Sequence, residues 1–332
     1  MDWSKGFSAS CYAMLVDPAT WRDTQRVEIT GGSVSRSSTG LRQSADLACR
    51  EWEPTRERWV RVYLDAAQAG QSEHVALFTG LTSVPETVID GNRRSYPVAC
   101  YSVLKPAEDI LLPRGWFAGE GLSAGDMVAE LLSVTPAPVA VEEGAPALRQ
   151  AIIAESGENR LTMTEKILSA IGWQMTIDGD GTIRIGPPET EIRATFGVDN
   201  DVVEPQVSLK ADWFSCPNCF RAIYGDQTAE ARDDNEDSML STVNRGREVW
   251  REESGVQLSD GEGLEQYAAR RLRELQAYAY TVRYSRRFDP AVNVGNKIRL
   301  HYPGQDLMDE YTVASQSITL GLGARVSEEV QR

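Results

Sequence analysis

Histidine is scarce in this 332-residue chain, which contains only His74 and His301. Zinc hydrolases and multi-histidine catalytic clusters depend on imidazole as a metal ligand or proton carrier. Two histidines cannot supply most such sites. The sequence therefore argues against these enzyme classes from the outset.

Positive charge is also in deficit. Lys and Arg number 34 against 49 Asp and Glu, so the formal net charge is −15. Affinity for duplex nucleic acid comes largely from cationic contacts to phosphate, and attachment to anionic membrane surfaces needs basic clusters. A protein that coats nucleic acid and a polybasic membrane-surface protein are both disfavoured.

Long hydrophobic runs and a paired cysteine framework are missing as well. The longest apolar run is about six residues (11–16), whereas a membrane span needs about 20. The N-terminal residues contain an acid early and no apolar h-region, so no signal peptide is predicted. An odd number of cysteines, five, indicates reduced thiols and assembly in the cytoplasm.

Composition and periodicity divide the chain into three parts. Residues 1–105 contain several short, partly alternating apolar segments separated by Gly, Ser, Asp and Asn. Residues 191–332 return to this pattern and add one amphipathic helix over 263–279. Short strands at close spacing favour a sandwich or barrel over a parallel sheet. The prediction is a mainly β protein with a small α+β part at 106–190.

The middle part carries helix and hairpin signals. Ser123 is predicted to cap a helix over 123–133, and Thr162 to begin a second helix that ends at Gly172. Alternating apolar residues over 173–185 flank the turn Asp178-Gly179-Asp180-Gly181, which is typical of a β-hairpin. That turn begins like a calcium loop, but the third ligand, the position-12 acid and the flanking helices are lacking.

One motif raises the possibility of a serine hydrolase. Gly121-Leu122-Ser123-Ala124-Gly125 matches G-x-S-x-G, the nucleophile elbow. The motif needs a buried strand before it, and the preceding residues 115–120 are too few and too rich in glycine. A helix cap at Ser123 is the favoured interpretation, with a hydrolase kept as an alternative.

A second motif raises the possibility of thiol chemistry. Cys216-Pro217-Asn218-Cys219 matches C-x-x-C, which can form a redox centre at a helix N-terminus or half of a zinc site. The following residues 220–224 are strand-like, and no second cysteine pair exists. A structural pair at the entrance to a strand is favoured, and a thiol oxidoreductase through Cys216 and Cys219 remains the alternative.

No cofactor or metal site is predicted, because the chain has neither a P-loop nor a complete dinucleotide fingerprint. Five tryptophans in or beside strand-like segments are expected to pack in the core or at a subunit interface. The five tryptophans are Trp52, Trp59, Trp173, Trp213 and Trp250. A glycan-binding tail-tip module is a further alternative, because such a module would use aromatic side chains exposed in a row.

The order of these pieces resembles bacteriophage tail baseplate hub proteins, related to late-control-D-type hubs and to the hub portion of type VI secretion spikes. The strand ending in Phe78-Thr79-Gly80, the two capped helices with their hairpin, and the closing helix followed by a strand after Gly295 carry the resemblance. Pro217-Asn218 stands where such hubs often have Pro-Asn before a strand. Cys219 replaces a usually aliphatic residue there, in keeping with a structural role for the pair.

The resemblance implies two tail-tube-like β-barrels, at 1–105 and 191–332, with the helix and hairpin domain at 106–190 between them. It implies a non-enzymatic virion protein, assembled in the bacterial cytoplasm. Three copies would form a ring that joins the hexameric tail tube, or a distal tail protein, to a spike or tail tip. DNA or the tape measure protein would pass through the channel without specific binding, and no membrane insertion is expected.

Under this hypothesis, the excess of acidic residues could serve the passage of DNA. An acidic channel wall would repel phosphate and keep DNA from adhering. We therefore expect acids to gather on the channel wall if the charge serves the passage of DNA. If they gather elsewhere, the charge is a solubility feature of the outer surface.

Overall fold

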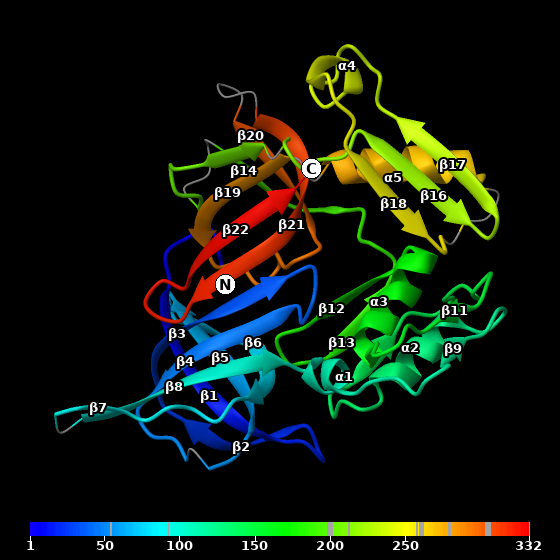
Figure 1. The fold of residues 1–332 in the computed structure, drawn as a ribbon. Coiled ribbons are helices and arrows are strands. Elements are labelled where there is room, and N and C mark those ends of the chain that lie inside the picture. Colours follow the sequence, from blue (N-terminus) through cyan, green and yellow to red (C-terminus); the bar gives the residue numbers. More distant parts are fainter. Residues whose placement is uncertain are drawn as a thin grey trace.

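The computed structural model describes residues 1–331 apart from 54, 92, 198–201, 212, 257, 259–261, 278–279 and 303–306. The protein is mainly β, as predicted, and its largest sheet has 14 strands. The pairings among the described residues run from edge to edge and close neither half into a barrel. Where the resemblance implies two barrels, the structure has open sheets, and the strands of the two β regions join in one large sheet (Figure 1).

The first part of the chain contributes eight strands. They are β1 (Ser8–Asp17), β2 (Arg22–Val27), β3 (Ile29–Ser37), β4 (Gln43–Cys49), β5 (Trp59–Gln68), β6 (Gln71–Thr82), β7 (Val88–Asp90) and β8 (Arg93–Ser102).

The middle part is richer than the predicted two helices and hairpin. Its elements are α1 (Lys105–Asp109), β9 (Phe117–Ala118), α2 (Ala124–Leu132), β10 (Val139–Val141), β11 (Ile152–Ile153), α3 (Arg160–Ile171), β12 (Gln174–Ile177) and β13 (Ile183–Gly186). The predicted hairpin is the β12–β13 pair, to which β10 adds a parallel strand.

The last part contributes the remaining elements. They are β14 (Ile192–Gly197), β15 (Ser208–Ala211), β16 (Cys219–Tyr224), β17 (Gln227–Arg232), α4 (Thr242–Arg245), β18 (Trp250–Ser254), α5 (Leu264–Ala277), β19 (Tyr280–Arg287), β20 (Lys297–Tyr302), β21 (Leu307–Thr319) and β22 (Arg325–Gln331). Helix α5 matches the predicted helix within the described residues, and residues 278–279 of that prediction lie outside them.

A seam between β3 and β21 joins the two ends of the chain into one sheet. The strands pair antiparallel from Ser33 with Thr319 to Ser37 with Ser315. The β21–β22 hairpin also places Ile318 and Val326 in the same core as Val34 of β3. The first β region therefore completes its core with residues that lie almost 300 positions later in the sequence.

A row of buried polar side chains crosses this seam. Arg36 of β3, Gln316 of β21 and Glu328 of β22 occupy directly paired positions, and each is at most 7% exposed. Glu328 accepts from Arg286 Nε at 2.9 Å and from Gln316 Nε2 at 2.7 Å. Arg36 Nη1 donates to Gln316 Oε1 at 3.5 Å. Arg286 lies on β19. Because buried charges are costly unless they are paired, this row fixes the register of β3, β21, β22 and β19 together.

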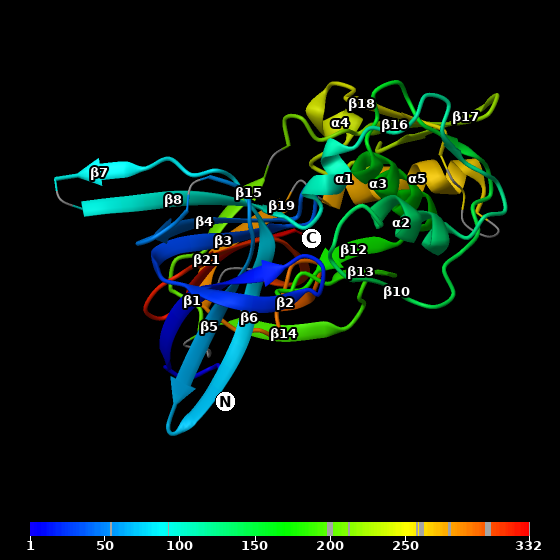
Figure 2. The same ribbon diagram turned by 90° about the horizontal axis from the view of Figure 1, so that it is seen from below.

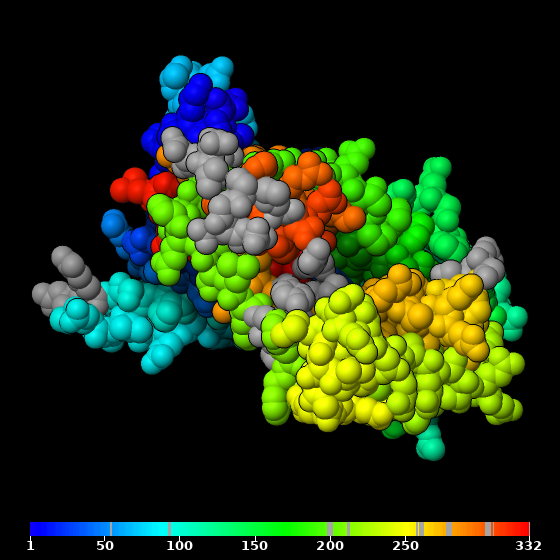
Figure 3. Space-filling view, turned by 90° about the horizontal axis from the view of Figure 1, so that it is seen from above, coloured from blue at the N-terminus to red at the C-terminus, as the bar shows by residue number. Residues whose placement is uncertain are grey.

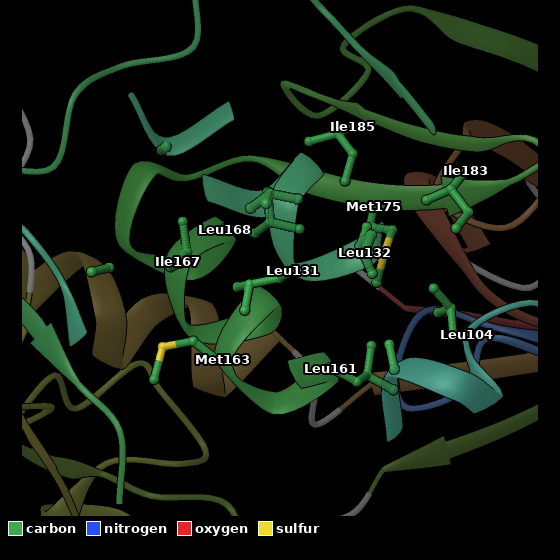
Figure 4. Close-up of a cluster of buried hydrophobic side chains, with 14 of the residues drawn as sticks. Leu104, Leu131, Leu132, Leu161, Met163, Ile167, Leu168, Met175, Ile183 and Ile185 are labelled. Atoms are coloured by element: carbon green, nitrogen blue, oxygen red, sulfur yellow. The ribbon is translucent and has the colours of Figure 1, made fainter. Parts of the chain in front are cut away.

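The middle part has a core of its own (Figure 4). Side chains of α2 and α3 pack onto β12 and β13 there, with Leu132, Ile167, Met175 and Ile183 at most 1% exposed. The helix ends explain the local geometry. Ser123 caps α2, as predicted, and Gly172 ends α3 in the left-handed conformation.

The predicted start of α3 is wrong by about one turn. Asn159, and not Thr162, is the N-cap, and its side chain accepts from the Thr162 N–H at 2.8 Å. Asn and Thr both satisfy free N–H groups at a helix start, so the spacing of one capping box misleads when a second capping residue stands three positions earlier.

A separate small layer is formed by β16, β17 and β18 with helix α5 over one face (Figure 1). Phe220 and Ala222 of β16 pack against Ala268 and Leu272 of α5. Residues 191–332 thus form separate apolar clusters, among them one in this layer and one among the strands from β14 to β22 that belong to the large sheet.

The buried row predicts that removing a buried acid lowers the stability more than removing an exposed one. Replacing Glu328 by Ala leaves the Arg286 guanidinium buried without its carboxylate and should lower the free energy of unfolding by about 3–5 kcal/mol. Glu310→Ala is the control, since the exposed Glu310–Arg299 pair should contribute no more than about 1 kcal/mol. Urea denaturation followed by tryptophan fluorescence measures both, and equal effects would contradict the role of the row.

Candidate assembly surface

The large sheet runs in the order β15-β19-β22-β21-β3-β4-β8-β6-β5-β1-β2, and β7 pairs with β8 in line with β6. The eight-strand run is the part of this sheet from β15 to β8 together with β7. Among the described residues, β15 pairs only with β19 and β7 only with β8. An open strand edge leaves backbone N–H and C=O groups free to pair with another chain.

Both open ends carry exposed apolar side chains. Val88 and Ile89 of β7 are 42% and 65% exposed, and Leu209 of β15 is 63% exposed. The β7–β8 ribbon also projects well beyond the body of the protein (Figures 2 and 3). A two-stranded ribbon is marginally stable alone in water, so the two ends have the character of contact surfaces.

Six serines lie together on one face of the sheet, on β3, β21 and β22. The alternation that buries Val34, Ile318 and Val326 turns their neighbours to the opposite side of the sheet. These neighbours are Ser33, Ser35, Ser37, Ser315, Ser317 and Ser327. This serine face also carries charges, of which Arg283 pairs with Glu329 and Arg325 with Glu204.

The Phe78-Thr79-Gly80 segment lies on β6, where it meets the middle part. Phe78 is fully buried in the first core. Thr79 is also fully buried; its hydroxyl donates to the Gly179 carbonyl at 2.8 Å and accepts from Arg61 Nε at 3.0 Å. A side chain at Gly80 would meet the Tyr101 carbonyl oxygen at 2.1 Å. Each residue of the segment thus has a packing reason for its type.

The hairpin turn of the middle part docks onto β6. A Cβ atom at Gly179 would lie 1.8 Å from the Ala76 carbonyl oxygen, so only glycine allows this close approach. The Asp180 carbonyl accepts from Trp21 Nε1 and from Arg61 Nη2, both at 3.0 Å. The turn that begins like a calcium loop is a docking turn, and its carbonyl groups face protein donors.

Asn218 and Gly295 also have structural positions. Asn218 is fully buried; its side chain donates to the Arg247 carbonyl and accepts from the Val249 N–H, which ties the start of β16 to the segment before β18. Pro217 precedes it in the same turn. Gly295 has φ of +88°, a conformation that L side chains rarely adopt, and its N–H donates to the Val313 carbonyl.

Ser123 is used as a helix cap. Its hydroxyl oxygen accepts from the Asp126 N–H at 3.3 Å, and its backbone forms an isolated bridge with Ala147. His301 lies on β20, whose neighbours belong to a different apolar cluster. The geometry of a nucleophile elbow, with a strand leading into the serine, is not formed by the two-residue β9.

The cysteine pair stands at the start of a strand and not at a helix N-terminus. Cys219 is the first residue of β16, and both Cys216 and Cys219 are buried. Burial raises the pKa of the Cys219 thiol, and the Glu248 carboxylate adds to the increase. A thiol nucleophile needs the opposite shift. Over the described residues, no group of three or more metal-ligating side chains is found.

The exposed large aromatic side chains lie on different elements. Tyr101 is on β8, Phe117 on β9 and Trp250 on β18, while Phe214 precedes β16. The Trp250 ring lies beneath the guanidinium groups of Arg221 and Arg232, at 5.1 and 5.3 Å. These four rings form no common row, whereas the rings of Tyr12, Tyr63 and His74 stack on one another across β1, β5 and β6. No described helix has the length and apolar character required to span a bilayer.

Comparison with known proteins was made by sequence and by fold. Neither a protein-family model nor a curated protein sequence matches the chain. The 43 kDa tail protein of prophage MuSo2 from Shewanella oneidensis superimposes with a TM-score of 0.71 at 14% identity, covering 98% of this chain and 97% of that one. A tail protein from Neisseria meningitidis gives 0.73 at 12% identity, covering 98% and 96%.

This chain has the fold of phage tail proteins. A component of the type VI secretion system from E. coli, described as similar to tail proteins gp27 and gp5 of bacteriophage T4, also matches, with a TM-score of 0.51, 10% identity and coverage of 92% and 73%. At the level of a tail-protein fold, the resemblance drawn from the motifs is confirmed.

The docking turn predicts that one methyl group disturbs the joint between β6 and the middle part. Gly179→Ala should lower the free energy of unfolding by about 1–3 kcal/mol, because a backbone must shift to admit the new Cβ. Gly6→Ala is the control, since nothing lies within 4 Å of a Cβ there. Urea denaturation measures both, and a neutral Gly179→Ala would refute the tight contact.

The buried thiols predict slow cysteine chemistry. Burial raises the pKa of Cys49 to about 11, so its thiolate fraction at pH 8 should be roughly a hundredfold below that of an unperturbed thiol. Ellman's reagent should therefore react slowly with the native protein, faster as the pH approaches 11, and at once in urea. A native Cys216–Cys219 pair that reacts rapidly at pH 7 would instead favour the oxidoreductase alternative.

Proposed function

We propose that the protein is a structural hub of a phage or phage-like tail, assembled as a homotrimeric ring with a central channel. The observation that carries this proposal is the eight-strand run, which spans two β regions and, among the described residues, has one unpaired edge at β15 and another at β7. Three copies would bring six β regions into one ring. Such a ring matches a hexameric tube on one side and a trimeric spike or tail tip on the other.

The two ends of the run are suited to pair with each other between copies. β15 of one subunit would add to β7 of the next, and repetition of this single heterologous contact closes a ring after three copies. Leu209 on one end and Val88 and Ile89 on the other would be covered. This contact between subunits would resemble the β3–β21 seam within the chain, where the two β regions already join edge to edge.

The serine face is the candidate channel wall. At β3, β21 and β22 the other face of the sheet carries core residues such as Val34, Ile318 and Val326, so the serine face is the one that a lumen could use there. Serine hydroxyls and two ion pairs make this face polar, and the exposed Asp46 of β4, which pairs with Ser33, adds a carboxylate to it. The acidic channel wall expected from the net charge of −15 stays a prediction.

We propose for this hub the same division of the chain into three parts that the resemblance implies. Residues 1–105 and 191–332 would be the two tube-like units, and residues 106–190 the small domain held to the first unit by the docking turn. Phe78, Thr79, Gly80, Pro217, Asn218 and Gly295 would be structural signature residues. The partners would be the tail tube or distal tail protein, the spike, and the tape measure protein or DNA in transit through the virion.

The alternatives have weaker support. The Ser123 hydroxyl is used as a cap, and the Cys219 thiol has a raised pKa at the start of a strand. Trp250 and Phe214, the aromatics most suited to glycan stacking, lie on separate elements and already face arginines. A hydrolase, a thiol oxidoreductase and a glycan-binding module therefore rank below the hub.

The edge contact predicts a specific assembly defect. Leu209→Asp places a charge in the proposed β15–β7 contact and should abolish ring-shaped trimers while leaving the thermal midpoint of the monomer within a few degrees. Ile153→Asp is the matched control, since Ile153 is equally exposed but lies on β11, outside the long sheet. Mass photometry and negative-stain images, with tube and spike partners present, measure the outcome.

Two results would contradict the hub. One is a wild-type chain that stays a compact monomer with those partners. The other is a Leu209→Asp variant that assembles as well as Ile153→Asp, which would displace the contact from β15.

A further inference from the structure

The two free edges of the eight-strand run belong to strands that point in opposite directions. All neighbouring strands in the order β15-β19-β22-β21-β3-β4-β8-β7 pair antiparallel. Because the run has an even number of strands, its first and last strands are oppositely directed. The rotation that generates the next copy in a ring leaves the direction of each strand along the axis unchanged. β7 of one copy would therefore meet β15 of the next as an antiparallel pair.

At the β15 edge, Leu209 lies on the covered face of the sheet, which is the face opposite the serines. Leu209 pairs with Val282 of β19, which pairs with Val330 of β22, and these two valines are at most 2% exposed. Directly paired residues share one face of a sheet. Leu209 is therefore the last member of an apolar row, and no described strand lies beyond it.

At the β7 edge, Ile89 lies on the same covered face. Ile89 pairs with Arg94 of β8, and side chains alternate along β8, so Arg94 shares its face with Val98. Val98 pairs with Leu47, and both belong to the core of the first region. By the same alternation, Val88 turns to the serine face.

The covered face is continuous between these two ends. Val326 and Val330 are both buried and lie four positions apart on β22, so they project from the same side of the strand. Val326 belongs to the apolar cluster of the first region and Val330 to that of the last strands. The exposed side chains of Leu209 and Ile89 thus project from one common face, at its two free edges.

Strand lengths and faces together select one register for the contact. β7 has three residues and β15 has four. Antiparallel pairing with Leu209 opposite Ile89 keeps both side chains on the covered face and pairs the whole of β7. A shift by one residue would set Leu209 opposite Val88 or Asp90, which lie on the serine face. A shift by two residues would set Leu209 beyond an end of β7.

The same register matches the polar positions on the serine face. It places Ser208 opposite Asp90, whose carboxylate can accept from the serine hydroxyl. Lys210 then lies opposite Val88 and diagonal to Asp90, so an opposite charge comes within reach of the ammonium group. Both faces of the contact therefore favour one arrangement.

We propose that Leu209 of one copy lies directly opposite Ile89 of the next in an antiparallel β15–β7 contact, and that this apolar pair sets the register between copies. The occupant of each free edge is thus a second copy of this chain. The β7–β8 ribbon projects from the body and leaves the outer edge of β7 open to that copy (Figure 2). This register presupposes the proposed hub, because it needs a ring in which every copy joins its neighbour.

The test is disulfide cross-linking of the full chain, under the conditions in which mass photometry counts ring-shaped trimers. Cβ atoms of directly opposite residues lie about 4.5–5.5 Å apart, close to the distance that a disulfide needs. On mild oxidation, Leu209→Cys combined with Ile89→Cys should give covalent trimers on a denaturing gel. The wild-type chain is the background control, since its cysteines are buried apart from the partly exposed Cys11.

A second pair leaves the apolar contact intact and reports the strand direction. Ser208→Cys with Asp90→Cys should also form covalent trimers, because these residues are opposite only in the antiparallel arrangement. Ser208→Cys with Val88→Cys is the matched control, since a parallel contact in the same register would join that pair. Lys210→Cys with Ile89→Cys tests a shift by one residue, and both control pairs should stay monomeric on the gel.

The outcomes separate the register from the hub itself. Ring trimers that cross-link at neither matched pair, or better at a control pair, would overturn the register and leave the hub standing. A wild-type chain that forms no ring would overturn the hub and the register together. Cross-linking confined to the two matched pairs would establish the antiparallel contact.

Discussion

The buried row formed by Arg36, Gln316, Glu328 and Arg286 is the constraint on which the large sheet depends. It runs across β3, β21, β22 and β19, so it links strands that are far apart in the sequence. A shift of β21 by one residue would turn Gln316 to the serine face and leave Arg286 and Glu328 without their shared neighbour. Apolar contacts tolerate small shifts, whereas a buried charge pair tolerates few.

The seam gives the protein its asymmetry. Because β3 and β21 already pair, each chain presents two β regions as one element with two different open ends. Different ends favour head-to-tail addition, which leads to a closed ring when the rotation per copy permits it. A hub of this kind would depend on the open strand edges and their exposure, and it would need no catalytic group.

A second joint holds the middle part. The docking turn places the carbonyl groups of Gly179 and Asp180 against Thr79, Trp21 and Arg61 of the first region. Arg36 connects the two joints, since it belongs to the seam and also donates to the Leu77 carbonyl on β6.

The sequence by itself determined the local structure where one segment decides it. The cap at Ser123, the left-handed end at Gly172, the β12–β13 hairpin and helix α5 follow from caps, turn residues and periodicity, which act within a few residues. The order of weak motifs such as Phe78-Thr79-Gly80 was enough to indicate the fold of phage tail proteins. The serine stripe was also visible as letters, although nothing marked it as one face of one sheet.

Tertiary structure alone decided what lies far apart in the chain. Strand β18 (Trp250–Ser254) and strand β22 (Arg325–Gln331) carry too many charges to follow an apolar alternation, and they are strands because neighbouring strands pair with them. Glu328 looks like a surface acid until Arg286 is placed beside it. Gly179 looks like an ordinary turn residue until β6 approaches within reach of its missing side chain. The seam, the buried row and the docking turn arise between distant segments, and local pattern carries no information on which distant segments will meet.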